Sequence, residues 1–199
     1  LEAEMQSDTL ELPQSVVCSL AEFHWFVAHL LAHLPRFWAA YNDSLAAYRY
    51  AHRLRNRAHP VPDLAQYDGW QEAPFWMWTA DDPRRRPVFA RQRGDQLELT
   101  DRHGQTMTLA LSVERDADVA AEQLAAAAAG GVKLRTRALA TTLFARLMLS
   151  DLFLHGIGGA KYDQVTDDIA RRFFGFSLPE YAVASATLRL PIAHAAEQH

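Results

Sequence analysis

Residues 151–167 read DLFLHGIGGAKYDQVTD, and the fold of the C-terminal part of the chain depends on how this stretch is interpreted. Three glycines occupy four positions here, between two segments whose apolar residues recur at helical spacing. Glycine ends helices and permits tight turns because it has no Cβ atom. The pattern predicts one helix that runs to His155 and a second from about Ala160 to Phe174, ended by Gly175.

The helix before the glycines, TTLFARLMLSDLFLHG (141–156), is apolar on nearly all faces. We therefore expect it to be buried on most sides. Asp151 would then be a buried carboxylate, which requires a partner because its desolvation is costly. His155 follows one turn later on the same face. The spacing predicts an Asp151–His155 pair that orients the imidazole for proton transfer; alternatively, the two side chains only cap the helix end.

The glycines also indicate a ligand site. Exposed amides at the start of a helix attract anions, and glycines let a ligand approach the backbone closely. The candidate ligand-binding residues are Gly156, Gly158, Gly159, Lys161, Tyr162 and Arg135. The spacing is not that of a Rossmann fingerprint or a P-loop, and a helix rather than a strand is predicted before it. The alternative is a helix C-cap at Gly156 followed by a tight turn.

Two strands are predicted around these helices, from VKLRTRALA (132–140) and YAVASATLRL (181–190). On the first strand, Lys133, Arg135 and Arg137 alternate and share one face. That face is either a ridge that meets an anion or a solvated strand edge. The sequence therefore predicts a βααβ unit with a glycine turn over 132–192, followed by a tail over 193–199.

The N-terminal part carries a different pattern. A flexible lead-in is expected over 1–14 and a helical hairpin over 15–60. Ser19 and Glu22 have the spacing of a capping box, and Pro35 suits the first turn of the second helix. Aromatic residues occupy both faces of these helices. We therefore expect apolar surface through which the chain self-associates, or which the remainder of a longer polypeptide covers.

Four segments between these regions have strand character: EAPFWMWTA, PVFARQR, DQLELT and QTMTLALS. The turns DDPRRR and DRHG join them in pairs, which predicts an antiparallel meander. The alanine-rich residues 114–129 predict a helix that Gly130 and Gly131 end. Residues 61–131 are thus expected to form a small antiparallel sheet plus this helix. The predicted fold class is α+β or α/β, in one compact fragment of a longer protein.

Composition excludes several classes of partner. The 199 residues carry a formal charge of −4, which argues against nucleic-acid binding. No uncharged apolar run approaches the roughly 20 residues that cross a bilayer, so we expect no membrane partner. A lone cysteine, Cys18, permits no internal disulfide and suits a cytoplasmic protein. His29 and His33 stand four residues apart without a third ligand, so no metal site is predicted. The sequence identifies no cofactor.

The segment KLRTRALATTLFARLMLSDLFLHGIGGAKYDQVTDDIARRFFGFSLPEYAVASATLRLP (133–191) resembles the C-terminal part of a family of uncharacterised bacterial proteins of the kind found in planctomycetes. EAPFWMW and DPRRRPVFARQRGDQLEL resemble the same family. Its members are longer than this chain, so the resemblance implies a fragment. It names no reaction.

The last third of the chain is also similar to the cysteine-adding enzyme of bacillithiol synthesis. That family carries L-R-P, then G-G-P-x-E-I-x-Y, then a strand preceded by proline. Gly158, Gly159 and Tyr162 match in type. The family's glutamate has no counterpart here, although Lys161 or Asp163 stands nearby. The resemblance implies an α/β ligase-like domain that binds a sugar–acid conjugate and a thiol amino acid.

These patterns predict a small-molecule site for an anionic ligand around residues 156–159, in part of a ligase- or transferase-like bacterial enzyme. Asp151 and His155 are the expected catalytic residues. The alternative is a noncatalytic structural or interaction module. In that case the glycine turn only connects two helices, and the first helices dock onto another domain.

Overall fold

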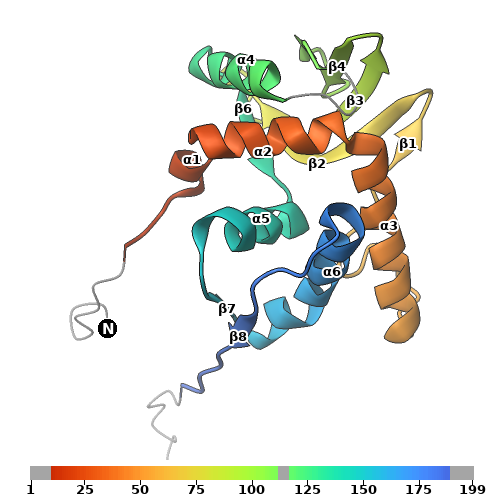
Figure 1. Cartoon of the computed structure of the whole chain (residues 1–199), viewed down its shortest axis with the longest axis vertical. Coiled ribbons are helices and arrows are strands. Elements are labelled where there is room, and N and C mark those ends of the chain that lie inside the picture. Colours follow the sequence, from red (N-terminus) through yellow and green to blue (C-terminus); the bar gives the residue numbers. More distant parts are fainter. Residues whose placement is uncertain (1–9, 112–116, 189–199) are drawn as a thin grey trace, which may run out of the picture.

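A computed structural model describes residues 10–111 and 117–188 of the chain (Figure 1). Helices combine with a small antiparallel sheet, so the fold is mixed α+β, as the sequence predicts. The elements in chain order are α1 (Gln14–Val17), α2 (Ala21–Ala32), α3 (Leu34–Ala51), β1 (Gln66–Tyr67), β2 (Trp70–Trp78), β3 (Arg86–Arg93), β4 (Gln96–Thr100), β5 (Thr106–Leu109), α4 (Asp118–Ala129), β6 (Lys133–Thr136), α5 (Ala138–Phe144), the π-helical turn η1 (Ala145–Leu149), β7 (Phe153–His155), α6 (Ile157–Phe174) and β8 (Tyr181–Val183).

The larger sheet is a meander in the order β1-β2-β3-β4-β5, and all of its pairings are antiparallel. β6 also pairs with β2, over a part of that strand that β1 does not reach. The register of β2 against β3 shifts between Ala73 and Trp76. Pro74 lies at this irregularity, where its missing N–H costs no ladder hydrogen bond. The four predicted strands are confirmed, and β1 lies in a stretch predicted as loop.

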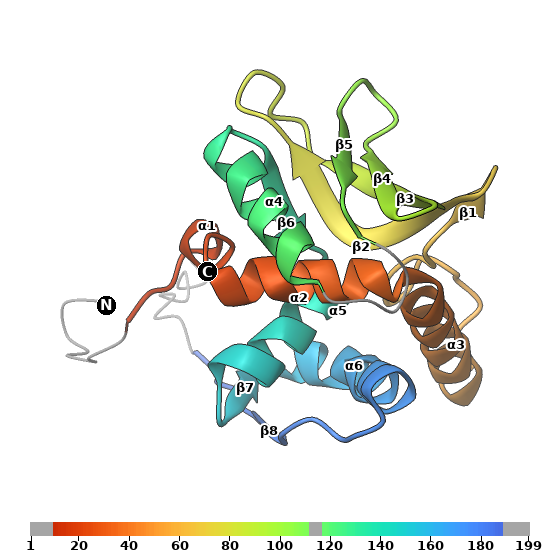
Figure 2. The same cartoon turned by 45° about the horizontal axis from the view of Figure 1, so that its top comes forward.

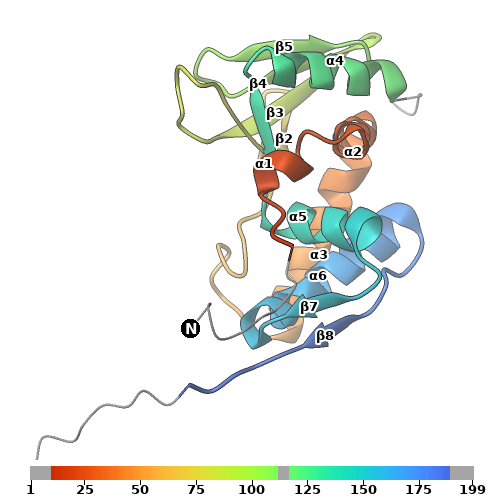
Figure 3. The ribbon, with the colours of Figure 1, turned by 90° about the vertical axis from the view of Figure 1, so that its left-hand side faces the viewer.

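Helix α2 crosses the middle of the molecule. The sheet and α4 lie on one side of it, and α5 and α6 lie on the other (Figures 1 and 3). Phe23 and Phe26 of α2 both contact Phe144, with ring centroids 5.4 and 5.1 Å apart. The expected exposed apolar face of the first helices is therefore wrong for most of their aromatic residues. They are apolar on several faces because other elements of the same chain cover those faces.

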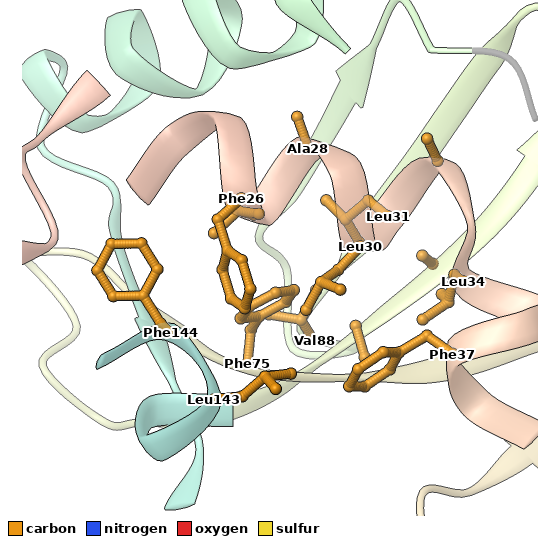
Figure 4. Close-up of a cluster of buried hydrophobic side chains, with 14 of the residues drawn as sticks. Phe26, Ala28, Leu30, Leu31, Leu34, Phe37, Phe75, Val88, Leu143 and Phe144 are labelled. Carbon is orange, nitrogen blue, oxygen red and sulfur yellow. The ribbon is translucent and has the colours of Figure 1, made fainter. Parts of the chain in front are cut away.

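The core joins these layers. Figure 4 shows Phe26, Leu30 and Leu31 of α2 among side chains from the sheet, α3 and α5. Phe75 and Val88 represent the sheet in this cluster, and both are fully buried. Burial of a large apolar side chain stabilises a fold by roughly 1.5–3 kcal/mol. α2 is thus the element on which the rest of the chain packs.

The starts of the first helices differ from the prediction. α2 begins at Ala21 with Leu20 at its N-cap, and no side chain caps it. The hydroxyl of Ser19 instead donates to the carbonyl of Val16, 2.7 Å away, so the predicted capping box is wrong. Only His33 separates α2 from α3, which leaves in a different direction (Figure 1). Most of the predicted lead-in, residues 1–9, lies outside the described residues.

The largest difference from the prediction lies between α5 and α6. The helical segment ends at Leu149, and Ser150 adopts an extended backbone with φ −138° and ψ 135°. The Ser150 hydroxyl donates to the carbonyl of Ala145 at 3.0 Å. Residues 153–155 then form β7, which pairs in parallel with β8. The predicted helix through His155 is wrong because pairing with a distant strand replaces helical hydrogen bonds there.

The other predicted ends hold in part. α4 ends before Gly130, as predicted, and residues 112–116 lie outside the described residues. α6 ends at Gly175, whose φ of 81° is left-handed, also as predicted. The closing strand is limited to β8, and 184–188 form no strand. The predicted tail, 193–199, lies outside the described residues.

Candidate functional site

Strand β7, helix α6 and strand β8 form a parallel βαβ unit that contains the glycines. His155 ends β7, and Gly156 is the N-cap of α6 with an extended backbone (φ −71°, ψ 163°). Gly158 and Gly159 lie in the first turn of α6. The turn therefore connects a strand to a helix, and the predicted helix before the glycines is replaced by a strand. The start of α6 lies at the carboxyl end of β7.

Three backbone amides at the start of α6 precede the first intrahelical donor. That donor is Ala160, whose amide bonds the carbonyl of Gly156 at 3.0 Å. The amides before it belong to Ile157, Gly158 and Gly159, as expected for the first turn of a helix. A Cβ atom at Gly156 or Gly158 would meet no atom within 4 Å. The backbone there is thus open to a ligand.

Gly159 has a different role, because it makes room for an imidazole. A Cβ atom at this position would lie 2.7 Å from Nδ1 of His155. Ring contacts with Phe153 and Tyr181 hold the same imidazole, at centroid distances of 4.6 and 5.2 Å. The His155 side chain is 10% exposed. Nδ1 therefore lies against the first turn of α6.

The other imidazole nitrogen contacts a buried carboxylate. Nε2 of His155 lies 2.9 Å from Oδ2 of Asp163. Asp163 is fully buried. Arg146, on η1, donates to the same Oδ2 at 2.7 Å. Because this oxygen already accepts from a guanidinium, His155 is the donor through Nε2. Nδ1 of the neutral imidazole is then the acceptor that faces the start of α6.

Arg146 joins three segments of the C-terminal part. Its side chain is 2% exposed, and it also pairs with Asp167 at 2.8 Å. It donates to the carbonyl of Pro179 at 2.5 Å and lies 4.9 Å from the ring centre of Tyr181. Among the described residues, Nε of Arg146 and Oδ1 of Asp163 are buried without a hydrogen-bond partner. Native proteins contain few such atoms, which makes this cluster a candidate site.

Tyr181 holds the start of α6 against β8. Its hydroxyl donates to the carbonyl of Ala160 at 3.0 Å. Burial raises the pKa of Tyr181, and the carboxylates of Asp167 and Asp163 raise it further. The phenol therefore remains a donor at neutral pH. A pocket of about 340 Å³ lies beside Arg146, Tyr181 and Asp167.

Asp151 is not where the sequence predicts it. It lies in the bend between η1 and β7, exposed to solvent, so the expectation of a buried Asp151 paired with His155 is wrong. The expected Asp–His pair exists, but its carboxylate comes from Asp163. Of the predicted ligand-binding residues, Lys161 and Tyr162 are exposed on α6 near the glycines.

Arg135 does not join this group. It lies on β6 in the larger sheet, on the far side of α2 from β7 and β8 (Figure 2). The predicted ridge is also divided, because Arg137 pairs with Glu72 within the core side of the sheet. The structure therefore brings together His155, the glycines, Lys161 and Tyr162, and it places Arg135 elsewhere.

The sequence interpretation missed Arg146, Asp163, Asp167 and Tyr181 as members of the site. Asp163 was explained by the helix dipole, and Asp167 was expected to pair with Arg171. Arg171 instead contacts Asp168 at 3.4 Å. One signal was available: Arg146 is a lone cation within the apolar run LFARLML. A cation in such a run requires a buried partner, and that partner follows 17 residues later.

Comparison with known proteins assigns no family. No protein-family model matches the chain, and no curated protein matches it. Within the described ranges, no cluster of three or more His, Cys, Asp or Glu residues is placed to hold a metal ion. None of the helices in those ranges combines the length and the apolar character that a bilayer crossing requires.

Proposed function

We propose that this chain is the anionic-ligand-binding part of a ligase- or transferase-like bacterial enzyme, with the ligand at the start of α6. One observation carries the proposal: an imidazole oriented by a buried carboxylate lies against the glycine turn. The turn follows a parallel strand, and ligands of open α/β sheets bind outside the carboxyl ends of such strands. The single, buried cysteine fits a reducing compartment, so we propose a cytoplasmic location.

The proposed site binds through the backbone. The amides of Ile157, Gly158 and Gly159 point out of the helix start, where the helix dipole favours negative charge. Lys161 is exposed on the same first turns and adds a positive charge. A phosphate or carboxylate group is the chemistry that these donors fit.

His155 supplies the proposed proton transfer. Asp163 holds its Nε2–H, which leaves Nδ1 able to accept a proton from a group bound at the turn. Arg146 keeps Asp163 in place but does not face the turn, so both are positioning residues. The similarity of Gly158, Gly159 and Tyr162 to the cysteine-adding enzyme of bacillithiol synthesis agrees with a ligase-like reaction.

The small sheet supports a further part of the proposal. Parallel sheets are normally covered on both faces. β7 and β8 instead carry Leu154 and Val183, 63% and 54% exposed, and Ile157 beside them is 55% exposed. We propose that another part of a longer polypeptide covers these residues and completes the ligand site.

The same exposed residues favour the second candidate function. In a noncatalytic interaction module, the β7–β8 face would bind a partner and the glycines would only shape the turn. Ligand binding distinguishes the two functions, because a module needs no anion.

The test is a titration of the ¹⁵N-labelled protein with phosphate, citrate and a nucleotide, followed by NMR. We expect saturable shifts in the amides of 156–161 with at least one of the three. Gly156→Ala adds a methyl group where no atom lies within 4 Å, so it should preserve the fold while hindering the ligand. Absence of any saturable shift in these amides would reject the ligand-binding function and leave the interaction module.

A further inference from the structure

A second site lies on the other side of α2, where α1, α2, α4 and β6 meet. A groove of about 310 Å³ is open there. The residues that matter on its walls are Cys18, His24, Ala128, Ala129, Lys133 and Arg135. The alanines of α4 leave the groove wide because their side chains are short. Figure 2 shows α4 and β6 together, separated by α2 from the β7–α6–β8 unit.

The groove is positively charged. Lys133 and Arg135 line it, and no Asp or Glu of the described part of the chain does. Arg135 bonds the carbonyl of Leu134 at 2.7 Å and lies 5.6 Å from the ring centre of Trp78. By contrast, the buried Arg146 and the neighbouring Arg137 are both paired with carboxylates. The two cations of the groove thus retain charge for a ligand.

His24 gives the groove a buried polar group. It is 6% exposed, its ring lies edge-on to Phe23, and it lines the groove. No side chain or carbonyl of the described residues forms a hydrogen bond with its imidazole. Burial lowers the pKa of His24, so the ring is neutral at neutral pH and retains one N–H donor.

Cys18 adds no negative charge to the groove. Burial raises the pKa of its thiol, although the nearby Arg135 opposes this rise. The thiol therefore stays protonated at neutral pH. The polar groups that face the groove are then two cations and neutral donors, a set that fits an oxyanion.

We infer that this groove binds a small organic oxyanion, a carboxylate or a phosphate monoester, through Lys133, Arg135 and the His24 N–H. The planar guanidinium of Arg135 matches two oxygens of either group. The alanine wall of α4 accommodates a compact apolar portion of the ligand. This site is independent of the one proposed at the start of α6, because α2 lies between them and they share no residue.

NMR of the whole chain tests the inference. Phosphate, glycerol phosphate and butyrate are titrated separately, and the His24 ring resonances are followed. We expect saturable shifts of these resonances with at least one probe; the stronger probe identifies the oxyanion. Loss of one charged hydrogen-bonding partner should weaken binding about tenfold or more, so we expect this effect in Arg135→Gln.

Arg85→Gln is the matched control, because Arg85 also stacks on Trp78, 5.2 Å from its ring centre, but does not line the groove. It should bind like the wild type. Lys133→Gln provides a second test if Arg135→Gln unfolds. Equal binding in the Arg135, Lys133 and Arg85 variants would overturn the inference, as would unchanged His24 resonances with all three probes. Failure of the α6 site would appear separately, in the amides of 156–161.

Discussion

Asp163 and Asp151 show what a sequence reveals about a single carboxylate. Both stand near His155 and a glycine, and both were available as its partner. Asp163 is buried and bonded, whereas Asp151 is exposed. The choice between them depends on whether 151–155 is helix or strand, and local periodicity does not determine that. The need for an Asp–His pair could be predicted, but not which aspartate supplies it.

The two aspartates give the first prediction. Asp163→Ala leaves the buried Arg146 without one carboxylate and His155 without its acceptor. We expect the free energy of unfolding to fall by roughly 3–5 kcal/mol, as for a broken buried ion pair. Asp151→Ala should change it by less than about 0.5 kcal/mol, as for an exposed site. Urea unfolding of both variants measures the difference. Similar losses in the two would contradict the structure of this site.

Two neighbouring glycines give the second prediction. In Gly159→Ala, the new methyl group would lie 2.7 Å from His155 Nδ1, so the imidazole must move. We expect a loss of about 1–3 kcal/mol, typical of overpacking. Gly158→Ala faces open space inside a helix and should stabilise the protein by up to about 1 kcal/mol. Thermal unfolding compares the variants; if Gly159→Ala were as stable as Gly158→Ala, the contact with His155 would be absent.

At the scale of elements, local signals predicted some elements and not others. The four strands of the meander follow from alternation and from short turns such as DDPRRR, because their pairing partners are neighbours in sequence. β7 could not be predicted this way. Its hydrogen bonds go to β8, on the other side of an 18-residue helix. A segment as apolar as LFLH fits either helix or strand, and the distant partner decides.

The turn between β4 and β5 gives a prediction on pH. Asp101 accepts from the amides of His103 and Gln105, at 2.8 and 3.0 Å, and from Arg86 at 3.0 Å. Burial alone would raise the pKa of Asp101. The hydrogen bonds and the charge of Arg86 outweigh burial and lower that pKa below its ordinary 3.8. The folded state thus binds a proton less readily than the unfolded state.

Asp101 therefore stabilises the fold above about pH 4, and this contribution disappears as the pH falls through its lowered pKa. Asp101→Asn removes the charge but retains much of the shape. We expect the variant to be less stable than the wild type at pH 6, and the difference to shrink at pH 2.5. Urea unfolding at both pH values measures it. A difference that is constant with pH would show that the carboxylate charge does not matter.

For the whole molecule, the sequence predicted the class of fold and misplaced its exposed apolar surface. The aromatic residues of α2 and α3 suggested an uncovered face, but the sheet, α4, α5 and α6 cover most of them. The exposed apolar side chains gather instead around the small parallel sheet, at Leu152, Leu154, Ile157 and Val183. Which face is covered depends on the packing of all elements, and no single helix carries that information.

This surface gives the prediction at the scale of the molecule. We expect concentration-dependent self-association in light scattering, because the β7–β8 face is apolar and uncovered. Leu154→Lys should reduce it. Tyr50→Lys is the control, since Tyr50 is 88% exposed but lies on α3, away from that face. A monomer at all concentrations, or equal effects of the two substitutions, would show that this face does not associate.

The most direct test of the account is phosphate binding by a pair of variants at Ile157, the first residue of α6. Ile157→Pro removes one amide donor at a position where proline suits a helix start. Ile157→Ala removes the same exposed side chain and retains the amide. The proposal predicts saturable phosphate binding in the wild type and in Ile157→Ala, and binding about tenfold weaker in Ile157→Pro, with unchanged helix content. Equal phosphate affinity in the two variants, or none in the wild type, would contradict it.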